Sequence, residues 1–310
     1  MTGKKDGITR RDFLRGTASA ALAAAVGLPL ASCRVVAAPQ AGQGAAEAGQ
    51  GAEKRARVVL VRDEAAVGDD GTINEEVVGR MLDEAVCALT DKGTPAEAWA
   101  ELVRPEDLVG IKSNVWANLP TPPEVERALR QRIAAVGVAE DRIRVTDREA
   151  RRLLADCTAL INVRPARSHH WSGMGGCIKN YIVFSDNPSQ YHPNACESLA
   201  LAWELPVCKG KTRLNILLAL TPQFYGRGPH AFDPRYVWPY KGMFVSFDPV
   251  ACDALGAHLL KTKRIAVFGE EQPLTPTTHI VAADEKYGLG VADLNRIDIL
   301  RLGWTQDSLI

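Results

Sequence analysis

Charged and imidazole side chains follow three predicted strands of this 310-residue chain, each at the point where a strand ends. Lys112 and Asn114 come after an apolar run at 108–111, and Asp147 follows the segment RIRVT at 142–146. The third strand, expected over 159–163, is followed by the polar residues Arg164, Arg167, His169 and His170. Ligands of an open parallel sheet bind beyond the carboxyl ends of its strands, so we expect these side chains to gather at one edge.

The residue types at this edge suit a small anion, either a carboxylate or a phosphate. Lysine and arginine are charged donors for both groups, and histidine exchanges a proton near neutral pH. An aspartate beside a histidine orients the imidazole or helps to hold a divalent metal. The sequence predicts the catalytic residues His169, His170 and Asp147. It predicts the ligand-binding residues Lys112, Asn114, Arg167, Lys179 and Asn180. Which histidine of the adjacent pair faces the ligand is left open.

A glycine-rich segment, SGMGGCIKN at 172–180, is a further candidate anion-binding element. Its three glycines allow backbone N–H groups to turn toward an anion, and Lys179 would add the compensating charge. The spacing departs from the P-loop pattern, because no Gly-Lys-Ser/Thr follows a four-residue gap, and this disfavours a nucleotide hydrolase. The alternative is a tight turn that uses glycine for its positive φ.

The segment FDPVACDALG at 247–256 begins a predicted helix. Asp248 is the expected N-cap and Pro249 the first helical residue. Asp253 lies five residues on, about 140° further around the helix, in an apolar stretch. A carboxylate there needs a partner, either a cation of the sheet edge or a divalent metal held by Asp248 and Asp253. The alternative is a solvated Asp253 on the outer face of the helix.

Strand-like and helix-like segments alternate along the body of the chain. The predicted strands span 57–62, 107–113, 142–146, 158–163, 214–220 and 243–247. The predicted helices include 78–89, one that begins at the cap sequence TPPE (121–124), 148–155 and 249–260. Crossover helices between successive strands force a mainly parallel, Rossmann-like α/β sheet with helices on both faces. Gly and Pro between 165 and 239 predict long loops at the carboxyl edge of the strands.

The first 33 residues resemble a twin-arginine export signal with a lipoprotein cleavage site. Arg10 and Arg11 precede an uncharged, Ala-rich stretch at 17–30, which is too short to be a permanent membrane span. Cys33 ends a lipobox-like LASC and is the expected lipidation site. Residues 34–56 then read as a flexible tether before an α/β domain at 57–310. We expect export by the twin-arginine machinery and a lipid anchor on the outer face of a bacterial membrane.

Charge and cysteine usage exclude other classes of partner and cofactor. Lys plus Arg equals Asp plus Glu at 37 each, so no overall positive field favours nucleic acid. The seven cysteines include no C-x-x-C pair and no haem-attachment pattern. The sequence therefore lacks a local iron–sulfur ligand cluster.

Five ordered segments together resemble the family catalogued as domain of unknown function 362. They are GIKSN (110–114), RVTD (144–147), LINVRPARSHH (160–170), GMGGCIKNYI (173–182) and FDPVACDALGAHLL (247–260), and the match extends over roughly 57–303. The resemblance implies site roles for Lys112, Asn114, Asp147, His169 or His170, Lys179, Asn180, Asp248 and Asp253. Arg167 stands where relatives commonly carry a lysine. Many relatives also have a ferredoxin-like cysteine cluster, which this chain lacks.

These observations favour an exported, membrane-anchored enzyme that acts on a small anionic substrate through lysine, histidine and aspartate. Two other hypotheses remain open at this stage. One is a metal or redox accessory protein, which twin-arginine export would suit. The other is a solute-binding lipoprotein without chemistry, which the anchor and tether would suit equally well.

Overall fold

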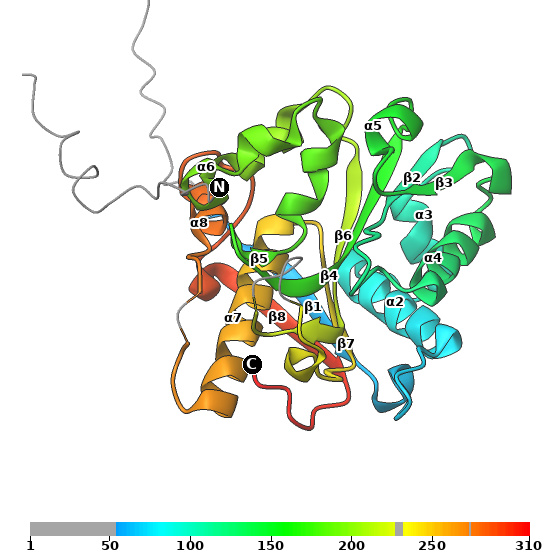
Figure 1. Ribbon diagram of the computed structural model, residues 1–310. Helices are drawn as coiled ribbons and strands as arrows, with labels where there is room; N and C mark the ends of the chain where they lie inside the picture. The colour runs from blue at the N-terminus through cyan, green and yellow to red at the C-terminus, as the bar shows by residue number, and fades with distance from the viewer. Residues whose placement is uncertain (1–53, 227–231, 273) are drawn as a thin grey trace, which may run out of the picture. The chain divides into compact units, whose positions relative to one another are not determined.

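The computed structural model describes residues 54–226, 232–272 and 274–310. Over these residues the chain forms an eight-stranded sheet in the order β3-β2-β4-β6-β7-β1-β8, and β5 pairs with β4 outside this path (Figure 1). The strands are β1 (Ala56–Arg62), β2 (Val109–Lys112), β3 (Ile143–Thr146), β4 (Ala159–His169), β5 (Gly173–Gly175), β6 (Thr212–Gln223), β7 (Gly242–Ser246) and β8 (Ile297–Gly303).

The sheet is mainly parallel, as the sequence predicts. Parallel pairing joins β2 to β3 and β4, β4 to β6, and β1 to β8. Two strands depart from it: β7 is antiparallel to β1 and β6, and β5 folds back antiparallel on β4. The predicted mixed α/β architecture with a Rossmann-like sheet is confirmed.

Helices cover both faces of this sheet. The α-helices are α2 (Glu75–Thr90), α3 (Pro95–Leu102), α4 (Pro123–Ala135), α5 (Ala150–Leu153), α6 (Pro193–Cys196), α7 (Pro249–Phe268) and α8 (Thr278–Glu285). Short 3-10 helices join them: η1 (Glu64–Ala66), η2 (Glu140–Arg142), η3 (Ile178–Phe184), η4 (Pro188–Tyr191), η5 (Glu197–Glu204), η7 (Pro234–Tyr236) and η8 (Leu294–Arg296). In Figure 1, α2, α3 and α4 lie on one side of the sheet and α7 and α8 on the other.

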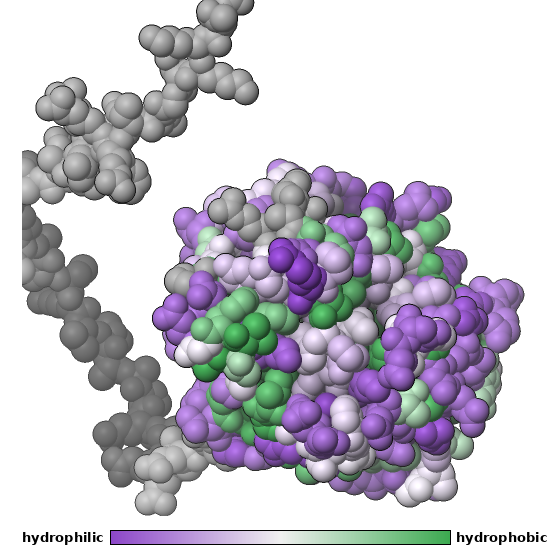
Figure 2. All heavy atoms as spheres, turned by 60° about the horizontal axis from the view of Figure 1, so that its bottom comes forward, coloured by the Kyte–Doolittle hydropathy of each residue, from purple (hydrophilic) through white to green (hydrophobic). Residues whose placement is uncertain are grey.

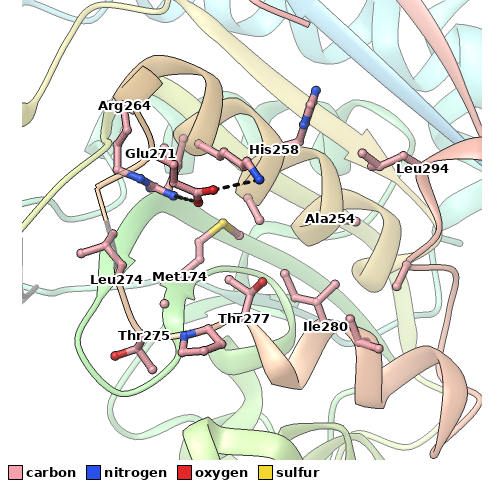
Figure 3. A pocket seen from close by; sticks show the side chains of 17 residues that line it. Met174, Ala254, His258, Arg264, Glu271, Leu274, Thr275, Thr277, Ile280 and Leu294 are labelled. Carbon is pink, nitrogen blue, oxygen red and sulfur yellow. Dashed lines mark hydrogen bonds and ion pairs between the residues drawn. The ribbon is translucent and has the colours of Figure 1, made fainter. Parts of the chain in front are cut away.

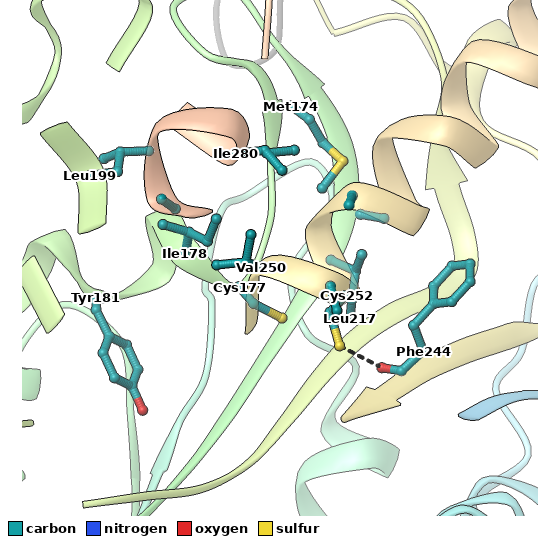
Figure 4. Close-up of a cluster of buried hydrophobic side chains, with 14 of the residues drawn as sticks. Met174, Cys177, Ile178, Tyr181, Leu199, Leu217, Phe244, Val250, Cys252 and Ile280 are labelled. Carbon is teal, nitrogen blue, oxygen red and sulfur yellow. Dashed lines mark hydrogen bonds between the residues drawn. The ribbon is translucent and has the colours of Figure 1, made fainter. Parts of the chain in front are cut away.

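Alternation along the strands creates two hydrophobic cores, one on each face. In β1, Val59 and Val61 face the α2 side, whereas Val58 and Leu60 face the α7 side. Successive side chains of a strand point to opposite faces, so one strand serves both cores. Figure 4 shows part of the α7-side core, where Met174, Leu217 and Phe244 surround the start of α7.

Helix boundaries follow local capping chemistry. The Asn74 side chain accepts the N–H of Val77 at the start of α2, and α7 ends at Gly269 with φ of 81°. The predicted cap of α4 is different. The Thr121 hydroxyl accepts the N–H of Asn114 at 3.2 Å instead of capping the helix, which begins after Pro122 without a side-chain cap.

The surface in Figure 2 mixes hydrophilic and hydrophobic residues, as is usual for a folded domain. Among the described residues, no helix has the length and apolar composition that a membrane crossing requires. The predicted export signal at 1–33, the lipidation site Cys33 and residues 34–53 of the predicted tether lie outside the described residues.

Candidate functional site

β4 is longer than the sequence predicts, and this changes how its polar residues are presented. The prediction ended the strand at Val163, but pairing with β6 continues through a register shift between Pro165 and Arg167. The three-residue β5 then pairs with the end of β4, placing Gly173 opposite His169. Arg164, Arg167 and His169 therefore lie within the strand, where main-chain pairing fixes their direction.

A buried polar row crosses the sheet on its α7 side. Lys112 on β2 lies beside Asn162 on β4, which lies beside Asn215 on β6 and then Ser246 on β7. All four are at most 1% exposed. The Asn162 amide donates to Asn215 Oδ1 at 3.0 Å, so neighbouring members of the row satisfy each other.

The Lys112 ammonium group makes three hydrogen bonds within the protein. Its Nζ donates to Ser113 O at 2.6 Å, to Asp147 Oδ1 at 2.6 Å and to Asn180 Oδ1 at 3.1 Å. These contacts use all three ammonium protons, so the ligand-binding role predicted for Lys112 is replaced by a positioning role. Burial lowers the pKa of Lys112 to about 8, against the opposing effect of the Asp147 charge.

Asp147 is the ion-pair partner of Lys112, and its second oxygen accepts the N–H of Val115 at 2.9 Å. Burial opposes ionisation of this carboxyl group, but the Lys112 charge and the hydrogen bonds outweigh burial, so its pKa lies below the ordinary value. The structure therefore places the predicted catalytic Asp147 against Lys112.

Asn180 holds η3 onto the sheet. Its Nδ2 donates to Asn162 Oδ1 at 2.8 Å, to Lys112 O at 3.1 Å and to Val163 O at 3.2 Å. Because both amide protons and the amide oxygen have partners in the chain, Asn180 also takes a positioning role in place of the predicted ligand contact.

The glycine-rich segment does turn backbone N–H groups toward an anion, but that anion is Asp253. The N–H groups of Cys177 and Ile178 donate to the two Asp253 oxygens at 2.6 and 2.9 Å. Glycine is required beside them, since a Cβ at Gly176 would lie 2.2 Å from Asp253 Oδ1. Burial raises the pKa of Asp253 to about 7, although the two hydrogen bonds and Arg164 lower it.

The two carboxylates predicted as metal ligands serve backbone amides instead. Asp248 caps α7 through the N–H groups of Val250 and Ala251 and also accepts from Val291 N at 2.9 Å. Across the described parts of the chain, no three His, Cys, Asp or Glu side chains are grouped so that they can hold a metal ion. The geometry thus assigns capping and loop-holding roles to Asp248 and Asp253.

Three further cations are buried on β4 and η3: Arg164, Arg167 and Lys179 are 5%, 4% and 3% exposed. None forms an ion pair with a carboxylate of the described residues. Arg167 donates to the neutral Asn114 Oδ1 at 3.0 Å and lies 4.5 Å from the centre of the Trp116 ring. We call these three residues the cation cluster.

The cation cluster contains N–H groups that have no oxygen acceptor among the described residues. Arg164 Nε and Arg167 Nε are buried without a hydrogen-bond partner in the described structure. Among the described residues, the hydrogen-bond partner of Lys179 Nζ is Cys196 Sγ, at 3.6 Å. Burial, followed by repulsion from Arg164, lowers the pKa of Lys179 to about 8.

His169 is held in one tautomer beside this cluster. Its Nδ1 accepts the N–H of Trp171 at 3.2 Å, which leaves Nε2 as the N–H donor of the neutral ring. Burial lowers the pKa of His169 far below its ordinary value, and the charges of Lys179 and Arg164 lower it further. The ring stacks on His170 at 4.9 Å between centroids, and His170 contacts the half-exposed Trp171 at 4.4 Å.

Two polar residues that the sequence did not single out also belong to this region. His279 on α8 is fully buried, and neither ring nitrogen has a partner among the described residues. The Gln223 amide, paired in register with Arg167, is likewise buried without a partner in that part of the chain. No motif or spacing marks either residue, because both come from segments distant in sequence from the glycine-rich loop.

A separate cavity of about 450 Å³ lies between α7, the segment before α8 and β5 (Figure 3). Two of its lining cations share one carboxylate: Glu271 pairs with Lys261 at 2.8 Å and with Arg264 at 3.2 Å. Gly173 and Met174 of β5 form part of its wall. Both cations that line this cavity therefore have a carboxylate partner, whereas the three of the cation cluster have none among the described residues.

Comparison with known proteins supports the resemblance seen in the sequence. Residues 132–258 match the model of the family described as Domain of unknown function (DUF362). No curated protein and no solved structure gives a significant match. The matched segment contains the cation cluster, His169 and Asp253, whereas Lys112 and His279 lie outside it. Over this segment the chain is similar to the DUF362 family.

Proposed function

We propose that this protein is an enzyme that binds a small anion, a carboxylate or a phosphate, at the carboxyl end of β4. The observation that carries the proposal is the cation cluster: Arg164, Arg167 and Lys179 are buried together without a carboxylate partner among the described residues. Removing a charge from water is costly unless it is paired and hydrogen-bonded. A bound anion would supply the missing partner.

The spare donors suit an oxyanion. Arginine presents a planar set of N–H groups that matches two oxygens of a carboxylate or phosphate, and lysine adds a point charge. In a water-poor site such charge-assisted hydrogen bonds are stronger than at the surface. Asp253 and Asp147 are already occupied, by backbone amides and by Lys112, and so leave the cluster open to an external anion.

In the proposed reaction the two adjacent histidines take different roles. His169 donates its Nε2–H to the bound anion as a neutral ring, because its Nδ1 is occupied by Trp171 N. His170 is less buried and lies between His169 and Trp171, so it is the group that exchanges a proton with the substrate. Lys112, Asp147 and Asn180 fix β2, β4 and η3 around them.

Thermal unfolding of the full chain with a panel of carboxylates and phosphates tests binding. A ligand that binds only the folded state raises the melting temperature. We expect at least one anion to do so, and Arg164→Met or Lys179→Met to abolish the shift. The matched control is Arg301→Met, which removes an exposed cation from the edge strand β8 and should keep the shift. The absence of a shift with every anion, or an unchanged shift in both cluster variants, would contradict the proposal.

Turnover separates an enzyme from a solute-binding protein. The ligand identified by thermal unfolding is incubated with wild-type protein and with His170→Ala, and products are followed by mass spectrometry. Product formation that His170→Ala removes supports the enzyme. Tight binding with no product over long incubation would instead make the protein a carrier.

We further propose that the protein is exported by the twin-arginine pathway and anchored by lipid at Cys33. The supporting observations are the paired Arg10 and Arg11, the uncharged stretch that follows them, and the LASC sequence. Replacing both arginines by lysine should keep the protein in the cytoplasm, and Cys33→Ala should release it from membranes. Unchanged fractionation of both variants would contradict export and anchoring.

A further inference from the structure

His279 is a fully buried imidazole without a hydrogen bond among the described residues. It is 0% exposed, and both Nδ1 and Nε2 lack a partner there. A buried polar group left unpaired destabilises the fold, so such a group calls for a ligand or an ordered water. His279 is the second residue of α8, a helix of eight residues that begins at Thr278.

The segment immediately before α8 lies against β5, which pairs with the strand that carries Arg164 and Arg167. β5 pairs with β4, placing Gly173 opposite His169 and Gly175 opposite Arg167. A Cβ on Gly173 would lie 2.9 Å from the Thr277 methyl group, immediately before α8. A Cβ on Gly175 would lie 3.0 Å from Arg164 Nη2. β5 therefore lies close to the start of α8 at Gly173 and close to Arg164 at Gly175.

The electrostatic environment of His279 links it to the same charges. Burial, followed by the charges of Lys179 and Arg164, lowers the pKa of His279 to about 3. The ring is therefore neutral at physiological pH and offers one N–H donor. The amino end of a helix adds a positive potential and further N–H groups, which favour an anion.

We propose that Arg164, Lys179 and His279 together bind a doubly charged tetrahedral oxyanion, a phosphate or phosphate monoester. This inference rests on the proposed function and narrows its substrate class. A dianion supplies two negative charges to the three cations of the cluster, whereas a monocarboxylate supplies one. A tetrahedral group also presents oxygens in several directions, toward β4, η3 and α8, whereas a carboxylate presents two oxygens in one plane.

The test is isothermal titration of the full chain with inorganic phosphate and with acetate, at pH 7.5 and equal ionic strength. We expect phosphate to bind at least tenfold more tightly than acetate. His279→Leu, which introduces an apolar side chain of similar size, should weaken phosphate binding at least tenfold. His279→Asn retains a donor and should bind phosphate more tightly than His279→Leu.

Arg164→Met provides a readout that does not depend on the His279 variants. If Arg164 serves the ligand, its removal should abolish phosphate binding while leaving the melting temperature of the free protein unchanged or raised, since an unpaired buried charge is lost. If Arg164 has a structural role, Arg164→Met should instead lower the melting temperature of the free protein, and this result would contradict the inference. Acetate binding as tight as phosphate, or phosphate binding unaffected by His279→Leu, would overturn the inference and leave the proposed function standing. Binding of neither anion would overturn both.

Discussion

The carboxylate of Asp253, in the second turn of α7, accepts the backbone N–H of Cys177 at 2.6 Å across 76 residues of sequence. This contact closes the glycine-rich loop over α7 and fills a backbone cradle that would otherwise attract an external anion. The cations next to it are left without such an internal partner in the described residues. The described residues therefore satisfy this cradle internally, and the proposed ligand would pair with the neighbouring cations.

Asp253 should make stability depend on pH. Its pKa of about 7 in the folded protein is raised above the ordinary 3.8 by burial, so the folded state binds more protons between these values. Stability should fall as pH rises from about 4 to about 7, by up to about 4 kcal/mol, and then level off. Urea unfolding of wild type and Asp253→Asn across this range measures the difference. Parallel pH profiles for the two proteins would refute this assignment.

Lys112 and Asp147 should behave as one coupled unit. Removing one partner of a buried pair leaves an uncompensated charge and costs about 3–5 kcal/mol. We expect Lys112→Met and Asp147→Leu each to destabilise the protein by that amount, and the double variant to cost clearly less than the sum. Arg152→Met, which breaks an exposed ion pair with Glu149, is the control and should cost less than about 1 kcal/mol. Additive effects of the two buried substitutions would contradict the coupling.

His169 should remain a neutral Nε2–H tautomer throughout the neutral range. Its lowered pKa has burial as the first cause and Lys179 as the second, and Trp171 N occupies Nδ1. Nitrogen-detected NMR of ring-labelled histidine, assigned with His169→Gln, should show no titration of this ring between pH 5 and 8. An ordinary transition near pH 6.5 would mean that His169 is free to act as a base.

Lys179 should set the upper pH limit of anion binding. Burial lowers its pKa to about 8 in the free protein, and a bound anion favours the ammonium form. Affinity should therefore fall by up to tenfold per pH unit above about 8. Lys179→Arg keeps its charge in this range and should bind with a flatter profile, although nearby Lys112 also titrates near pH 8. An identical alkaline decline in wild type and Lys179→Arg would assign the effect to Lys112.

The fold and the gathering of polar residues at one sheet edge could be predicted from sequence because both follow from local patterns. Apolar runs at 57–62, 142–146 and 214–220 correspond to β1, β3 and β6. Polar residues after successive strands predicted one edge, and Lys112, Asp147 and Asn180 do meet there. The ends of the strands and the alternation of apolar and polar residues can be recognised in the sequence without knowledge of tertiary contacts.

The roles of the individual polar residues could not be predicted, because they depend on which N–H donors already have acceptors within the protein. The residue type does not distinguish Lys112 from Lys179. Among the described residues, the Lys112 ammonium group donates to three oxygens, whereas the Lys179 ammonium group has the Cys196 sulfur as its partner. The occupation of the loop amides by Asp253 and the position of His279 depend on packing between distant segments. Residue type and spacing do not encode such contacts.

The most direct test is a crystal structure of the full chain grown with selenate, whose anomalous scattering locates the anion. The proposed function is supported by an anomalous peak within hydrogen-bonding distance of the Arg164 guanidinium and the Lys179 ammonium group, absent in crystals of Arg164→Met. Crystals at saturating selenate with an unoccupied cation cluster, or with internal carboxylates paired to all three cations, would contradict it.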